Sequence, residues 1–113
     1  MAEKVAGLMR AIEVCGFGSF FAEKTEFGDI DLLLVHADRS KESCAHAIRC
    51  KRELQTTLQN LHVTMLSKQA EQSFSFKLTA QAKHLGFINM FLGGSEIEKI
   101  VVLIKAYAPI RLL

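Results

Sequence analysis

The apolar run at residues 30–35 is the strongest strand signal in the sequence, and it most limits how the chain can fold. Asp31 interrupts this run near its start, and Asp29 stands immediately before it. Residues two apart on a strand project to the same side, so Asp29 and Asp31 are expected side by side, with Cα atoms roughly 6–7 Å apart. The sequence therefore predicts a carboxylate pair at the end of an otherwise buried strand.

The spacing of apolar residues elsewhere predicts helices alternating with strands. Helices are expected over 5–15, 38–60, 67–85 and 95–107, strands over 61–66 and 87–92, and a short strand or sharp turn over 17–21. Ser67 fits the N-cap of the third helix and Gly86 its end, while Ser95 and Glu98 fit a capping box for the fourth. The isoleucines and valines of the last segment make a strand the alternative there.

This alternation predicts one α/β or α+β domain over residues 1–113, with a small mixed β-sheet flanked by helices. Half of the 113 residues are apolar, which indicates a folded protein rather than a disordered tail. The net charge of only +2 is too small to indicate a general nucleic-acid or anionic-membrane binder. Cys15, Cys44 and Cys50 show no zinc-ligand spacing and are expected to be reduced thiols. Without a signal peptide or a long apolar run, the expected location is the cytoplasm, with no membrane contact.

Gly18 and Ser19, upstream of the two aspartates, carry groups suited to phosphate. Glycine lets the backbone approach a ligand closely, and the serine hydroxyl can donate to a phosphate oxygen. Mg²⁺ needs few carboxylates when phosphate oxygens and waters supply its other ligands, so Asp29 and Asp31 are enough to hold it. Nucleotide and metal are therefore expected to bind together.

The order Gly18-Ser19, nine further residues, and then Asp29-Ile30-Asp31 leading into an apolar strand resembles the signature of the DNA polymerase beta-like nucleotidyltransferases. In size the chain is similar to the minimal, antitoxin-type members of that superfamily, and the resemblance is most specific over residues 17–36. It implies a nucleotidyltransferase-like fold. It also implies transfer of a nucleoside monophosphate from a triphosphate, expected to be ATP, to a hydroxyl on a protein or RNA, with release of pyrophosphate.

The resemblance further implies catalytic roles for Asp29 and Asp31 as ligands of Mg²⁺, with Gly18 and Ser19 holding the triphosphate. Lys24 is the nearest counterpart of the basic residue that the family usually carries closer to Gly-Ser, and it is the third expected nucleotide-binding residue. Some small family members are antitoxins beside HEPN-type toxins, so a toxin of this type or an RNA acceptor is the expected macromolecular partner.

The sequence departs from the family pattern on the strand expected over 61–66. Catalytic members usually carry a third carboxylate there, but this segment contains no acid, and His62 or Thr64 stands near that position. The nearest acids, Glu53 and Glu71, lie on the expected neighbouring helices. A two-metal site would therefore be incomplete. His62 is a candidate substitute base, and the alternative is a strand histidine that only pairs with a neighbouring residue.

Two kinds of function remain open from these residues. The favoured one is an Mg²⁺-dependent nucleotidyltransferase. The alternative is a non-catalytic relative that binds nucleotide as a sensor or docks a partner such as a toxin. The apolar stretch over 100–113 is expected either to cover the core or to form an interface between two copies of the chain. The interface is the favoured alternative, so a homodimer is expected.

Overall fold

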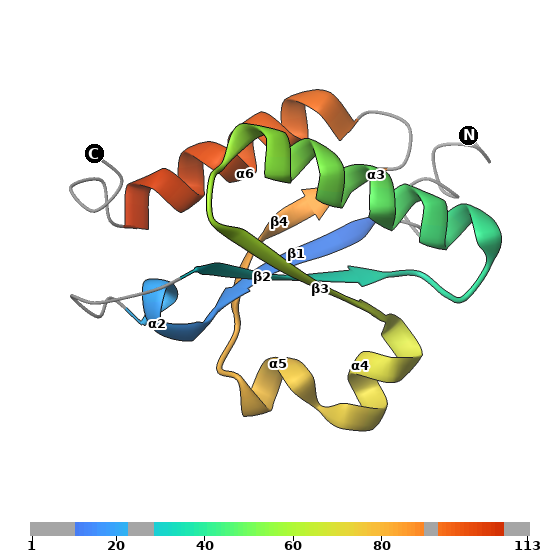
Figure 1. The fold of residues 1–113 in the computed structure, drawn as a ribbon. Coiled ribbons are helices and arrows are strands. Elements are labelled where there is room, and N and C mark those ends of the chain that lie inside the picture. Colours follow the sequence, from blue (N-terminus) through green and yellow to red (C-terminus); the bar gives the residue numbers. More distant parts are fainter. Residues whose placement is uncertain (1–10, 23–28, 90–92, 108–113) are drawn as a thin grey trace.

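The computed structural model describes residues 11–22, 29–89 and 93–107, which form one four-stranded mixed sheet with helices on both faces (Figure 1). The strands lie in the order β3-β2-β1-β4. β1 pairs antiparallel with β2 and β4, whereas β2 pairs parallel with β3. The predicted mixed sheet flanked by helices is confirmed. The strands are β1 (Ile12–Phe17), β2 (Ile30–His36), β3 (Leu61–Ser67) and β4 (Lys83–Ile88).

β2 is the strand predicted over residues 30–35, and it is buried on both faces of the sheet. Ile30, Leu32 and Leu34 belong to the core on one face, and Leu33 and Val35 to the core on the other. All five side chains are at most 3% exposed. A strand buried on both faces must be apolar almost throughout, which explains why it reads as a continuous run rather than an alternating one.

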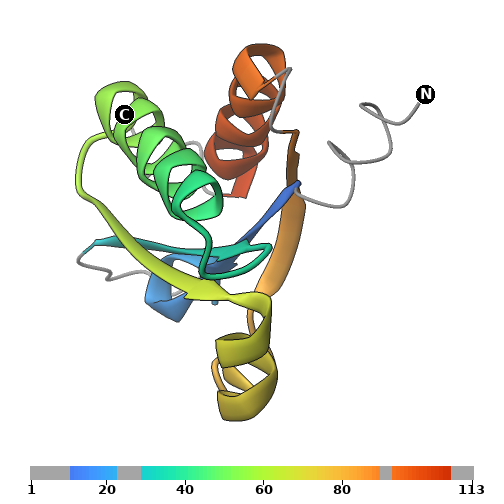
Figure 2. The same cartoon turned by 90° about the vertical axis from the view of Figure 1, so that its right-hand side faces the viewer.

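Two long helices, α3 (Lys41–Thr57) and α6 (Gly93–Tyr107), lie side by side over one face of the sheet (Figures 1 and 2). Two short ones, α4 (Lys68–Phe74) and α5 (Phe76–Thr79), lie over the other. The α3–α6 side holds most of the core, whereas the α4–α5 side buries a small cluster around Cys15, Leu33 and Val35. A single helical turn, α2 (Gly18–Phe21), follows β1 directly.

Serine caps set the first residue of α4 and of α3, and only the cap of α4 was predicted. The Ser67 hydroxyl accepts a hydrogen bond from Ala70 N at 3.1 Å, as expected for the residue that ends β3 and begins α4. α3 is shorter than the predicted 38–60, because the Ser40 hydroxyl caps it by accepting from Ser43 N at 3.1 Å. At its C-terminal end α3 stops at Thr57, because Leu58 has an extended backbone conformation.

The C-terminal helix is confirmed over its strand alternative, but the predicted capping box is wrong. α6 begins at Gly93, so Ser95 lies inside the helix instead of at its N-cap. An acid of the first turn, Glu96, instead accepts a hydrogen bond from Asn89 N at 3.0 Å and ties the end of β4 to the helix. None of the helices among the described residues is long and apolar enough to cross a membrane.

The helix predicted over 5–15 is wrong where the structure describes it, because Ile12 and Cys15 lie on β1; residues 1–10 lie outside the described ranges. Ile12 and Val14 face the α3–α6 core, and Cys15 faces the opposite side. The apolar residues of β1 have helical spacing, but backbone pairing with β2 and β4 on its two sides makes this segment a strand. Of the segment 17–21, Phe17 ends β1 and the rest is the turn α2.

The helix predicted over 67–85 is also wrong beyond residue 79. Ser75 adopts a left-handed conformation with φ of 49° that separates α4 from α5, and Gln81 does so with φ of 53° after α5. Leu85 and Gly86 then lie on β4 rather than at a helix end. β4 therefore starts earlier than the predicted strand over 87–92, of which residues 90–92 lie outside the described ranges.

Truncating β2 will show how much of the stability depends on its burial. We expect Leu32→Ala to lower the free energy of unfolding by about 2–5 kcal/mol, because Leu32 is fully buried and the change leaves a cavity. Leu78→Ala is the matched control, since that leucine is 81% exposed and its loss should change stability by less than about 0.5 kcal/mol. Urea denaturation measures both, and equal losses would contradict this placement of the core.

Candidate functional site

The ends of three neighbouring strands meet at one end of the sheet. β1 is antiparallel to β2, so Phe17, the last residue of β1, pairs with Asp31 near the start of β2. β3 is parallel to β2, so His62, the second residue of β3, pairs with Asp31 from the other side. The strand pairing therefore places Asp31 between the Gly18-Ser19 turn and His62.

Gly18 touches Asp31 directly. Its φ is +79°, a conformation that side chains disfavour, and a Cβ added there would lie 2.5 Å from Asp31 Oδ2. A glycine is thus required by both backbone conformation and space. Ser19 is partly exposed and follows in the same turn, which is anchored by the fully buried Phe20 and Phe21.

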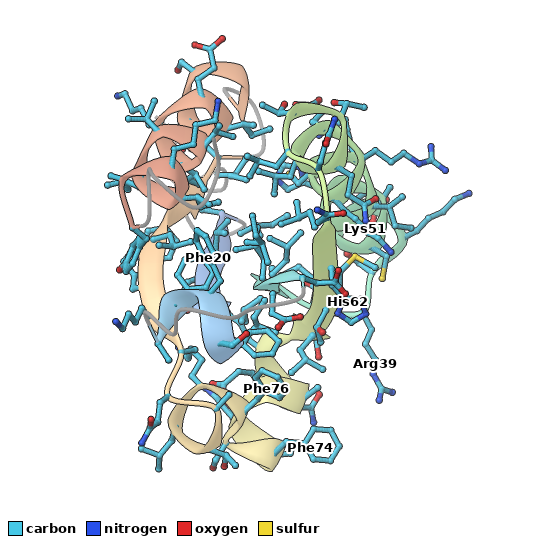
Figure 3. The ribbon with its side chains drawn as sticks, turned by 60° about the vertical axis from the view of Figure 1, so that its left-hand side comes forward. Phe20, Arg39, Lys51, His62, Phe74 and Phe76 are labelled. Atoms are coloured by element: carbon cyan, nitrogen blue, oxygen red, sulfur yellow. The ribbon has the colours of Figure 1, made fainter. Side chains whose placement is uncertain are left out.

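Asp31 projects to the α4–α5 side of the sheet, the same side as Leu33 and Val35, as the alternation predicts. Its side chain is 27% exposed, and Oδ1 lies 3.5 Å from His62 Nδ1. The His62 side chain is 66% exposed and stands on the edge strand β3 (Figure 3). Thr64 pairs with Leu33, so His62 rather than Thr64 is the neighbour of Asp31.

The remaining predicted site residues are less closely placed. Asp29 is exposed at a bend just outside β2, so the strand alternation that orients Asp31 does not extend to it. The start of β2 is held by a hydrogen bond from Ile30 N to Asn60 O at 2.8 Å. Lys24 lies outside the described residues. The structure thus places Gly18 and His62 against Asp31, whereas Asp29 is near only because it lies two residues earlier in the chain.

Neither nearby acid acts as a third carboxylate beside Asp31. Glu71 is buried, and its Oε2 accepts a hydrogen bond from Lys77 N at 3.1 Å, which holds the α4–α5 junction. Glu53 lies on α3, which covers the opposite face of the sheet. Two aspartates with phosphate oxygens suit one Mg²⁺ ion, and the imidazole of His62 is a poor ligand for a second.

A second cluster of polar side chains, Glu13, Cys15 and His84, lies on the same side of the sheet. One potential ligand atom from each lies within 4.8 Å of the others, and no other such trio of histidine, cysteine or acidic residues occurs in the described ranges. His84 Nδ1 is 2.9 Å from Glu13 Oε2, and Lys77 Nζ donates to Glu13 Oε1 at 2.9 Å.

The sequence does not reveal this cluster, because the helical spacing predicts helices over both of its segments. If β1 is taken as a strand, the two-residue spacing of Glu13 and Cys15 puts them on the same side of the sheet, and that spacing is the signal the sequence offers. His84, however, is 69 positions beyond Cys15 and reaches the cluster only through the pairing of β4 with β1.

The surroundings shift the titration of this cluster. Burial raises the pKa of Glu13, but hydrogen bonds from Lys77 and His84 outweigh it, and the net pKa is lowered. Burial, with the nearby Glu13 charge, raises the pKa of the Cys15 thiol to about 12. The hydrogen bond to Glu13 raises the pKa of Lys77.

Comparison of the chain with family models, with curated proteins and with solved structures finds no significant match.

The contact between Gly18 and Asp31 can be measured by a double-mutant cycle. We expect Gly18→Ala to lower the free energy of unfolding by at least about 1–2 kcal/mol, the cost of a positive φ at a residue with a side chain. In an Asp31→Ala background the cost should be smaller, because the oxygen that the new Cβ would strike is gone. Urea denaturation of the four proteins provides the test, and an identical cost in both backgrounds would show no contact.

The three cysteines should differ in reactivity. Burial raises the pKa of the Cys50 thiol to about 11, and both Cys15 and Cys50 are buried, whereas Cys44 is partly exposed. Only about one Cys15 thiol in ten thousand would be ionised at pH 8, so Cys44 should be alkylated first in the folded protein. Peptide mapping after iodoacetamide treatment, with chelator present, measures this, and urea should equalise the rates. Equally fast labelling of folded Cys15 would contradict it.

Proposed function

We propose that this protein is an Mg²⁺-dependent nucleotidyltransferase that uses ATP and whose site is formed by Gly18, Ser19, Asp29 and Asp31. The observation that carries the proposal is the contact between the Gly18 backbone and the Asp31 carboxylate. Motif residues 13 positions apart in sequence are neighbours at one end of the sheet. A backbone turn without a side chain, beside a carboxylate, suits a triphosphate that bridges to a metal ion.

Each residue has a distinct part in binding. Gly18 keeps the turn open to phosphate, and the Ser19 hydroxyl donates to a phosphate oxygen. Asp31, held between Gly18 and His62, and the exposed Asp29 provide metal ligands. When bound, Mg²⁺ would neutralise phosphate charge and align the reacting groups.

His62 is the proposed base that accepts the proton of the attacking hydroxyl. Its Nδ1 faces Asp31 Oδ1 at 3.5 Å, which leaves Nε2 as the nitrogen that can take a proton. Its 66% exposure leaves room for an acceptor as large as an RNA or a protein. A HEPN-type toxin is one such protein, and the cytoplasm, where ATP and reduced thiols occur, is the proposed location.

One observation favours a second function, a module that binds nucleotide and docks a partner without transfer. In the described part of the chain, Asp29, Asp31 and His62 do not bring their ligand atoms within 4.8 Å of one another, and no third acid stands beside Asp31. Binding of one metal with its nucleotide does not require that acid, whereas two-metal transfer does.

Both functions predict Mg²⁺-dependent binding of labelled ATP that Asp31→Asn weakens at least tenfold, because the metal loses a charged ligand. Asp29→Asn should act similarly, while Glu98→Gln on the exposed side of α6 should have no effect. Equilibrium dialysis with and without a chelator measures this. Binding that ignores both aspartate changes would overturn the assignment of the site.

Transfer separates the two functions. Incubation with labelled ATP, Mg²⁺ and cell lysate should label an acceptor, and His62→Gln should remove most of the label while leaving ATP binding intact. His62→Asp places a carboxylate beside Asp31 and should strengthen Mg²⁺-dependent binding. Absence of transfer by the wild-type protein, with binding retained, would establish the non-catalytic function instead.

A further inference from the structure

The cluster of Glu13, Cys15 and His84 is not used by the proposed function. Two of its residues come from β1 and the third from β4, so it is built on the paired strands of the sheet rather than on a loop. From Cys15, 1% exposed, to His84, with a side chain 50% exposed, it runs from the core to the surface.

An irregularity in β4 brings His84 to this side of the sheet. The pairing steps from Val14 with Gly86 to Cys15 with His84, so β4 contains one extra residue, Leu85. Leu85 is buried in the α3–α6 core, and a Cβ at Gly86 would lie 3.4 Å from Ile100 of α6, so both positions face that side. Two successive residues facing one way is the signature of a β-bulge. Without it, Leu85 rather than His84 would oppose Cys15.

We propose that Glu13, Cys15 and His84 form a binding site for a zinc ion. Imidazole nitrogen, thiolate sulfur and carboxylate oxygen are the three ligand types that zinc takes in proteins, and their separation of at most 4.8 Å is close to what one ion needs. A buried thiol among the ligands disfavours Mg²⁺ and Ca²⁺, which prefer oxygen.

The groups around the cluster complete a metal environment. Glu13 Oε2 faces His84, whereas Oε1 accepts from Lys77, so the carboxylate can bind the ion through one oxygen while Lys77 orients it through the other. Lys77 Nζ also lies 3.9 Å from Glu71 Oε1. Zinc binding requires the Cys15 proton to leave to solvent. The carboxylates of Glu13 and Glu71, the Cys15 thiolate and the Lys77 ammonium then carry a total charge of −2, which a zinc ion balances.

Three protein ligands leave the fourth position of a tetrahedral zinc ion for water or another small ligand. A cavity of about 160 Å³ adjoins the cluster and is lined by Glu13, Glu71, Lys77 and Phe87 among others. The cavity meets the cluster at Glu13, one of the three ligands.

Zinc titration of the chelator-treated full chain, without nucleotide, tests the proposal. We expect one equivalent to bind, and Co²⁺ in its place to show a thiolate-to-cobalt charge-transfer band. Cys15→Ser and His84→Gln should each abolish both signals. Cys44→Ser and His62→Gln are matched controls outside the cluster and should retain them, as should Asp31→Asn, which keeps this test separate from that of the nucleotide site.

His84→Gln decides the matter if Cys15→Ser fails to fold, because His84 is half exposed and its replacement leaves no buried cavity. Circular dichroism verifies the fold of each variant. The proposal is overturned if the wild-type protein binds no zinc, if binding persists in folded His84→Gln, or if the cobalt complex lacks the thiolate band.

Discussion

The two-sided burial of β2 is the constraint on which the rest of the structure depends. A strand apolar on both faces must have a neighbour on each edge and a covering layer on each face. β1 and β3 provide the edges, α3 and α6 one layer, and α4 and α5 the other. Asp31 is the one charged residue within this strand, and it is tolerated because it lies where the strand begins and where Gly18 leaves space.

The elements predictable from sequence were those whose signals are local. The apolar run of β2, the amphipathic pattern of α3 and the cap at Ser67 each involve residues close in the chain. β1 was mistaken for a helix because what decides its conformation is pairing with β2 and β4, which the sequence does not display. The helix expected over 67–85 is interrupted at Ser75 and Gln81, and neither glycine nor proline marks these left-handed positions.

The same distinction applies to the two candidate sites. Gly18, Ser19, Asp29 and Asp31 are close in sequence and stand in a motif order, so they could be proposed without coordinates. The position of His62 required the parallel register between β2 and β3. The cluster of Glu13, Cys15 and His84 required both a correct strand assignment and the extra residue in β4, and no short motif encodes either. Local patterns thus point to candidate sites built from one segment and miss those that depend on strand pairing.

The unequal division of the core has a consequence for dynamics. Most buried side chains lie between the sheet and the pair α3 and α6, whereas α4 and α5 cover only a few residues. Phe74 is exposed to solvent (Figure 3), and so is Leu78. Local opening costs least where few apolar contacts are broken. We therefore expect the amide protons of α4 and α5 to exchange with solvent through partial opening, and those of β2 to exchange only through global unfolding. Asp31, Glu13 and His84 all project toward this weaker layer, so both candidate sites lie on the side that a ligand would enter without unfolding the main core.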